Sequence, residues 1–150
     1  FFSKYKMPRD PDESPIVCGV DDSEIHSAIK RGDRKALEDC IAKGLVNERS
    51  SCGKTPLMVA GYYTQKEMMS LLLDNGAVIN ALDENTGDTA AHYVTMSLSG
   101  GIRQSGCMIV LAEHGADVDI RNDDGYTVFE LAAKNGNSEI AEAYASVVNA

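Results

Sequence analysis

Histidine and cysteine are the side chains of this chain that most readily serve as bases, nucleophiles or metal ligands. A histidine beside a hydroxyl or a carboxylate can act as a general base, and cysteines and histidines at short spacing can hold zinc. His26, His92 and His114 are widely separated along the 150 residues, and the four cysteines include no Cys-x-x-Cys pair and no spacing shared with a histidine. The sequence therefore predicts no catalytic residues and no metal site.

Two glycine-containing segments could in principle hold a phosphate or a calcium ion. Gly100-Gly101 lacks the following lysine and serine or threonine of a phosphate-binding loop. Asp123-Asp124-Gly125 begins like a calcium loop, but no further ligands and no closing glutamate follow at the required distance. We therefore expect no cofactor, and we predict that the protein is not an enzyme.

Composition excludes some partners and suggests a compartment. The net charge of −9 and the isoelectric point near 4.7 argue against nucleic-acid binding, which needs clustered lysine and arginine. No apolar run is long enough for direct membrane insertion. Cys40 and Cys107 fall on apolar helical positions, so we expect buried free thiols and an intracellular, cytoplasmic location. Because the chain begins with Phe1, an organelle reached after removal of a targeting peptide stays open.

The elements that would position these side chains form a repeat. Gly53-Lys54-Thr55-Pro56-Leu57 recurs in altered form as Gly87-Asp88-Thr89-Ala90-Ala91 and as Gly125-Tyr126-Thr127-Val128-Phe129, at intervals of about 35 residues. Leu71-Leu72-Leu73-Asp74-Asn75-Gly76-Ala77 has a counterpart that ends in Gly115-Ala116. Repetition at this period predicts stacked supersecondary units that share one apolar core.

Helix signals within each unit indicate a pair of short helices. Thr55 is a suitable N-cap, Pro56 suits the first helical turn, and Thr127-x-x-Glu130 reads as a capping box. The patterns predict a helix ending near Tyr62, a second over 66–75, and a last helix over 138–148, with glycines such as Gly76 ending them.

On the Gly-x-Thr-Pro-Leu and Leu-Leu-Leu-x-x-Gly-Ala motifs, the chain resembles the ankyrin-repeat family. The resemblance covers roughly residues 23–148. It implies an all-α solenoid of about four helix-turn-helix units with projecting turns, near 23–50, 51–84, 85–121 and 122–148. Residues 1–22 do not match, and their prolines and aromatic residues predict an extended N-terminal arm.

Three local features depart from a plain repeat or invite a second interpretation. The third unit is about five residues longer, and the glycine and serine content of Ser97–Gly106 predicts a mobile bulge, either functional or a tolerated insertion. His92 is expected to form a structural hydrogen bond with Thr89. Asn80 is expected to shape a turn, although some ankyrin proteins are hydroxylated at this position.

The resemblance also implies a function, since ankyrin repeats commonly bind partners through a concave face and turn tips. This chain is accordingly predicted to be a non-catalytic protein–protein interaction module, a scaffold or an adaptor. The alternative is a permanent structural subunit of a large assembly, tethered by the N-terminal arm. Tyr62 and Tyr63 could instead pack against the neighbouring unit. The partner-binding positions implied by the family pattern are Lys30, Arg31, Lys54, Tyr62, Tyr63, Asp88, Met96, Ser97, Tyr126, Lys134 and Asn135.

Overall fold

The computed structural model describes residues 23–97 and 101–149 of the chain. The predicted N-terminal arm, residues 1–22, lies outside the described residues, as do residues 98–100 of the predicted bulge.

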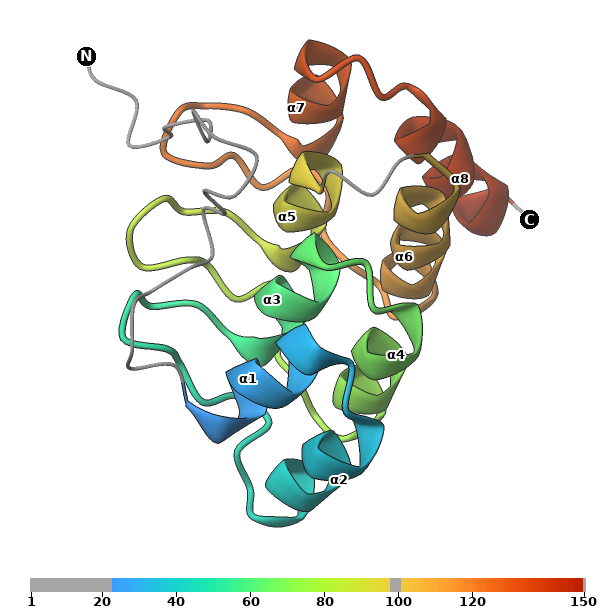
Figure 1. Cartoon of the computed structure of the whole chain (residues 1–150). Coiled ribbons are helices and arrows are strands. Elements are labelled where there is room, and N and C mark those ends of the chain that lie inside the picture. The colour runs from blue at the N-terminus through green and yellow to red at the C-terminus, as the bar shows by residue number, and fades with distance from the viewer. Residues whose placement is uncertain (1–22, 98–100, 150) are drawn as a thin grey trace.

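The described residues form helices joined by turns and contain no strand. The helices stand in two columns, with α1, α3, α5 and α7 in one and α2, α4, α6 and α8 in the other (Figure 1). The loops between successive pairs project to the left of that view. The bounds are α1 Glu24–Arg31, α2 Arg34–Ala42, α3 Pro56–Tyr62, α4 Lys66–Asp74, α5 Ala90–Met96, α6 Gly101–Glu113, α7 Val128–Lys134 and α8 Glu139–Val148. The prediction of an all-α solenoid of paired helices is confirmed.

Threonine caps start three of the four first-column helices. The hydroxyls of Thr55, Thr89 and Thr127 each accept a hydrogen bond from the backbone N–H three residues later, at 3.3, 3.4 and 3.3 Å. In each case the side chain at that later position also accepts a hydrogen bond from the threonine N–H, which completes a capping box. The repeated threonines therefore fix where each unit begins.

One apolar core runs through the whole stack. Leu37, Leu72, Leu111 and Ile140, one from each second-column helix, have no exposed surface. They belong to a single cluster of buried side chains that extends from α1 to α8. No unit has a separate core, so each unit depends on its neighbours for burial.

Glycine is required where neighbouring projecting turns approach one another. The backbone of Gly87 has φ +70°, and a Cβ atom there would lie 2.6 Å from Oδ1 of Asp123 in the next turn. The repeated glycine thus permits both the left-handed conformation and the close packing of adjacent turns.

The prediction of a mobile bulge over Ser97–Gly106 is wrong for its described second half. Helix α6 begins at Gly101, so residues 101–106 are helical despite their glycine and serine content. Buried Gln104 holds this extra helical length in place, because its side-chain amide donates to the carbonyl oxygens of Val94 at 3.0 Å and Ser97 at 2.8 Å. Tertiary contacts at the end of α5 thus override weak local helix propensity.

Thr64 is the one described non-glycine residue with positive φ, at +49°. It lies between α3 and α4, where the corresponding positions of the first and fourth units are Gly32 and Gly136, with φ of +69° and +73°. A β-branched side chain is disfavoured in this conformation. In addition, the buried Thr64 hydroxyl has no hydrogen-bond partner.

We therefore expect Thr64→Gly to raise the free energy of unfolding by about 1 kcal/mol. Relief of backbone strain and loss of the buried unpaired hydroxyl outweigh the extra flexibility of the unfolded chain. Urea unfolding of both proteins measures the difference. A Thr64→Val control retains the strain but lacks the hydroxyl, so it should recover only part of the gain. A loss of stability in Thr64→Gly would contradict this explanation.

Candidate functional site

His92 connects the third unit to the fourth. Its Nδ1 atom accepts a hydrogen bond from the Thr89 N–H at 3.1 Å and lies 2.9 Å from the Thr89 hydroxyl. Since Nδ1 is an acceptor, Nε2 carries the proton and donates to the Tyr126 carbonyl oxygen at 2.9 Å. The predicted structural bond between His92 and Thr89 is confirmed, and both ring nitrogens are occupied by this structural role.

His26 makes the corresponding bridge from the first unit to the second. Its Nδ1 atom pairs with the Ser23 hydroxyl, and Nε2 lies 2.8 Å from the Lys54 carbonyl oxygen. In the second unit Met58 holds the equivalent position, and its sulfur accepts only from the Thr55 N–H, at 3.4 Å. The histidine bridge therefore exists between units one and two and between three and four, but not between two and three.

A buried network built on an ion pair joins the turns before α3 and α5 instead, and reaches unit three through Tyr93. Nζ of Lys54 lies 2.7 Å from Oδ2 of Asp83, and their side chains are 6% and 0% exposed. The Tyr93 hydroxyl donates to the same Asp83 oxygen at 2.5 Å, and the Lys54 ammonium lies 5.6 Å from the centre of the Tyr93 ring. The other oxygen, Oδ1, accepts from the Asn85 N–H at 2.8 Å. Sequence reasoning missed this network, because no local pattern indicates a buried lysine.

Asp88 is a second buried carboxylate, near the bridge of His92. Its Oδ1 atom accepts a hydrogen bond from the Asn122 amide at 2.9 Å, whereas Oδ2 has no partner. Burial raises the pKa of Asp88, and hydrogen bonds from Thr86 and Asn122 oppose the shift. Burial likewise lowers the pKa of His92. The histidine is therefore neutral at pH 7, as its hydrogen-bonding pattern requires.

We predict that His92 makes the protein less stable as the pH falls. Its folded pKa lies below the unfolded value of about 6.5, so its contribution is complete above that pH and is lost as the pH falls further. Urea unfolding at pH 7.5, 6.5 and 5.5 should show a decline of at most about 1.4 kcal/mol per pH unit from this group. His92→Gln should remove that part of the pH dependence, and an unchanged profile would contradict the prediction.

The structure separates the predicted partner-binding positions into three groups. Arg31, Lys134 and Asn135 are exposed. Lys30, Tyr63, Met96 and Tyr126 are half-buried. The buried members are Lys54, Tyr62, Asp88 and Ser97.

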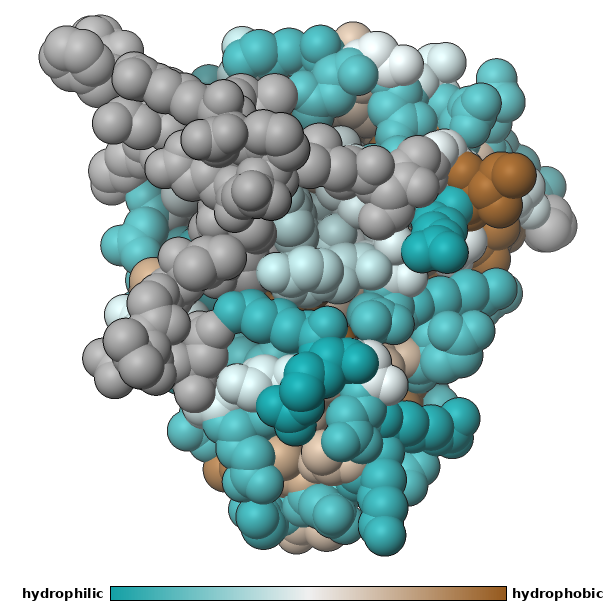
Figure 2. Space-filling view, in the orientation of Figure 1, coloured by the Kyte–Doolittle hydropathy of each residue, from teal (hydrophilic) through white to brown (hydrophobic). Residues whose placement is uncertain are grey.

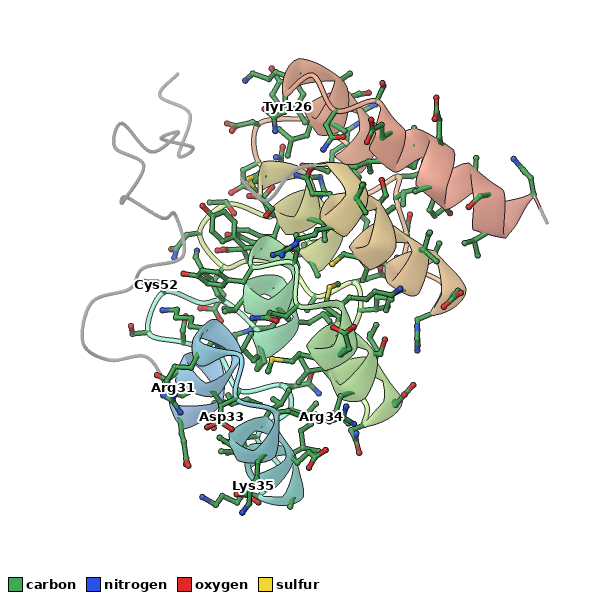
Figure 3. The ribbon with its side chains drawn as sticks, turned by 45° about the vertical axis from the view of Figure 1, so that its right-hand side comes forward. Arg31, Asp33, Arg34, Lys35, Cys52 and Tyr126 are labelled. Carbon is green, nitrogen blue, oxygen red and sulfur yellow. The ribbon has the colours of Figure 1, made fainter. Side chains whose placement is uncertain are left out.

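Seven of these residues keep accessible surface along the ends of the first-column helices and the turn before α7. We call them the first-helix surface, which comprises Lys30, Arg31, Tyr63, Met96, Tyr126, Lys134 and Asn135. Nζ of Lys134 lies 4.8 Å from the centre of the Tyr126 ring, a cation–π contact between α7 and the preceding turn. Figure 3 labels Tyr126 beside α7 at one end of the stack and Arg31 on α1 at the other. The buried Tyr62 packs edge-on against Tyr63, with ring centres 5.3 Å apart, and so supports it from below.

The cysteines differ in state. Cys40 and Cys107 are buried free thiols, as expected, and burial raises the pKa of Cys107 to about 12. Cys52, in the turn before Gly53, is disulfide-bonded. No disulfide was expected from the sequence, since cysteine spacing alone does not establish pairing.

The described residues also bear on the expectations for Asn80, for metal binding and for membrane insertion. Asn80 forms a structural bond, because its Oδ1 accepts from the Asp117 N–H at 2.9 Å in the next turn. Within residues 23–97 and 101–149, no cluster of histidine, cysteine, aspartate or glutamate is arranged to hold a metal ion. None of the helices in this part of the chain has the length and apolar character that crossing a bilayer requires.

Comparisons with known proteins agree with this architecture. The family description "Ankyrin repeats (3 copies)" matches residues 25–122, and "Ankyrin repeats (many copies)" matches residues 108–143. Putative ankyrin repeat protein FPV031 of fowlpox virus is 37% identical over 108 residues, which are 70% of this chain and 30% of that protein. Human ankyrin repeat and SOCS box protein 11 is 30% identical over 123 residues, or 79% of this chain and 35% of that protein. The chain thus spans about a third of these curated relatives.

A solved structure shows the same fold. An ankyrin repeat domain from Acinetobacter baumannii superposes with a TM-score of 0.75 at 23% identity, covering 85% of this chain and 65% of that one. The threonine caps, the glycine turns and the histidine bridges account for the same stacking here. From these repeats and matches, the chain belongs to the ankyrin-repeat family.

Proposed function

We propose that this chain binds a partner protein through the first-helix surface. Ankyrin repeats are generally protein–protein interaction modules, and their fold is typically non-catalytic. The observation that carries the proposal is the accessible Tyr126 ring with the Lys134 ammonium over its face. A tyrosine held in place by a neighbouring cation offers apolar area with little loss of side-chain freedom on binding.

The arrangement of the other members supports the same surface. Tyr63 and Met96 present partly accessible apolar groups at the ends of the first-column helices of units two and three, between Arg31 at one end and Lys134 at the other. Aromatic residues, methionine and arginine are enriched where proteins bind one another. A partner that contacts several units at once would combine an apolar centre with charged ends.

The buried members of the predicted set have a supporting role in this proposal. Lys54 and Asp88 hold the turns together, Tyr62 supports Tyr63, and the Ser97 carbonyl receives the Gln104 side chain. In this proposal they affect binding by holding their accessible neighbours in position, and they do not touch the partner themselves.

The proposal is tested by using the chain to capture a partner protein from an extract of the source organism. Tyr126→Ala/Lys134→Ala is expected to weaken retention of the captured protein by at least about tenfold, because a few aromatic and cationic anchors carry a large share of the binding energy of an interface. The control Lys43→Ala/Glu142→Ala removes exposed charges on α8 and beside α2 and should bind like the unaltered protein. Circular dichroism first establishes that all variants are equally helical. Undiminished capture by the Tyr126→Ala/Lys134→Ala variant would contradict a contact at this surface.

A further inference from the structure

A groove of about 730 Å³ lies on the second-column side of the stack, apart from the first-helix surface. The loop between α3 and α4 forms one wall, the start of α6 forms the other, and α8 contributes one side chain. Its lining residues are Thr64, Gln65, Lys66, Glu67, Ile102, Arg103, Ser105, Gly106, Ile109 and Glu139. Five of them lie on α6, and most of these five fall in the extra length of the third unit, which therefore forms one wall of the groove.

The groove has an apolar anchor. Ile102 is 91% exposed, the largest exposure among the large hydrophobic side chains of the described residues. Ile109, two turns along the same helix, is half-buried and lines the groove as well. Figure 2 shows brown, apolar surface beside strongly hydrophilic groups on the α6–α8 side of the molecule. A side chain from a partner could cover Ile102 and remove it from water.

The opposite wall offers unused hydrogen-bond donors. Thr64 is one of the lining residues and is 9% exposed, and its buried hydroxyl has no hydrogen-bond partner. Helix α4 begins at Lys66 with no side-chain cap, so the first N–H groups of this nine-residue helix remain available. Thr64, with its positive φ, lies two residues before the first residue of this helix. Such a helix end with a neighbouring hydroxyl favours a carboxylate.

The charges around the groove also favour an acidic ligand. Lys66 and Arg103 are exposed, and neither has an ion pair among the described residues. The Glu139 carboxylate lies against Gly101 at the start of α6, where a Cβ atom would collide with it, so the positive end of that helix offsets its charge.

Further cations surround the adjacent loop between α1 and α2. Figure 3 labels Arg31, Arg34 and Lys35 there, together with Asp33. The two loops are in contact, because the Gln65 amide reaches the Ile29 carbonyl oxygen at 3.4 Å. Arg34 is already paired with Glu38 at 3.1 Å, so Arg31 and Lys35 are the cations of this loop that would add to the attraction for an acidic segment.

We propose that this groove is a second docking site, which takes an extended segment of another protein with an acidic residue next to an apolar one. The carboxylate pairs with Lys66 and Arg103 and receives hydrogen bonds from Thr64 and the start of α4. The apolar side chain covers Ile102. Glu67 and Glu139 in the same groove disfavour a uniform polyanion such as RNA.

Titration of the ¹⁵N-labelled chain with a terminally blocked hexapeptide of alternating glutamate and leucine tests the site. Saturable amide shifts are expected at 64–68 and 102–106. The same peptide with glutamine in place of glutamate should bind at least about fivefold more weakly. Arg103→Glu and Ile102→Ser should each weaken binding of the glutamate peptide, whereas the exposed control Lys43→Glu should not.

Three results would overturn the proposal. They are equal binding of the glutamine peptide, shifts confined to the first-helix surface, and binding that Arg103→Glu leaves unchanged. None of these substitutions alters Tyr126 or Lys134. A negative peptide titration would therefore not contradict partner binding at the first-helix surface, and a negative capture experiment would not contradict this groove.

Discussion

Replacing Lys54 with methionine is expected to lower the free energy of unfolding by about 3–5 kcal/mol. Methionine fills a similar volume but leaves the Asp83 carboxylate, which is 2% exposed, without its cation. The Tyr93 hydroxyl and the Asn85 N–H still donate to Asp83. Two neutral donors cannot replace an ammonium at 2.7 Å, because a buried charge needs an opposite charge as well as hydrogen bonds. Urea unfolding followed by circular dichroism measures the loss.

A double variant distinguishes the cost of an unpaired buried charge from the cost of lost side-chain packing. Lys54→Met/Asp83→Asn removes both charges and keeps one oxygen that can accept from the Asn85 N–H, while the new amide NH2 can donate to the Tyr93 hydroxyl oxygen. The double variant should be more stable than Lys54→Met, because both lack the lysine but only Lys54→Met retains a buried, unpaired carboxylate. The exposed pair of Lys43 and Glu24 gives a matched control, and Lys43→Met should change stability by less than about 1 kcal/mol. If the double variant is no more stable than Lys54→Met, the cost does not arise from the buried carboxylate.

The location of this ion pair explains why its loss should be severe. Units one and two, and units three and four, are joined by histidines that donate to a carbonyl oxygen of the next turn. Met58 provides no such bond between units two and three. The ion pair and Tyr93 are therefore the buried side-chain connection at the centre of the stack, where both halves of the solenoid meet, and more exposed bonds such as that from the Asn85 amide to the Cys52 carbonyl oxygen accompany it.

Most of the fold could be predicted from sequence because its determinants are local. Thr55, Thr89 and Thr127 mark helix starts, and glycines such as Gly87 mark turns, all within a few residues of the element they define. The predicted helix ends differ from the observed ones by a single residue at α4 and α8, where helix termini give weak signals.

The remaining features depend on contacts between units, which local patterns do not carry. Glycine and serine near the start of α6 favour a loop, yet Gln104 bonds to α5 and holds those residues in a helix. Lys54 and Asp88 lie in turns beside repeat glycines, where the family pattern implied contact with a partner, but they are buried between turns. Seven of the predicted partner-binding positions keep accessible surface, and their role in binding stays a prediction.

Leu72→Ala is expected to cost about 2–5 kcal/mol of the free energy of unfolding. Leu72 has no exposed surface and lies on α4, which packs against α2, α3 and α6. Neighbouring side chains are held by helices on several sides, so they cannot collapse fully into the space left by the missing methyl groups. Leu73→Ala is the control on the same helix, since Leu73 is only half-buried and should lose much less stability.

The loss should not be distributed evenly, because a stack of repeats is held together by contacts between neighbours. A cavity on α4 weakens the contacts of unit two with both adjoining units, and unit one has no other described unit to pack against. Amide hydrogen exchange of Leu72→Ala should therefore show faster exchange throughout α1–α4 than in α5–α8. Equally faster amide exchange in all eight described helices would mean that the stack unfolds as one unit. The Lys54–Asp83 ion pair would then couple the stability of the two halves.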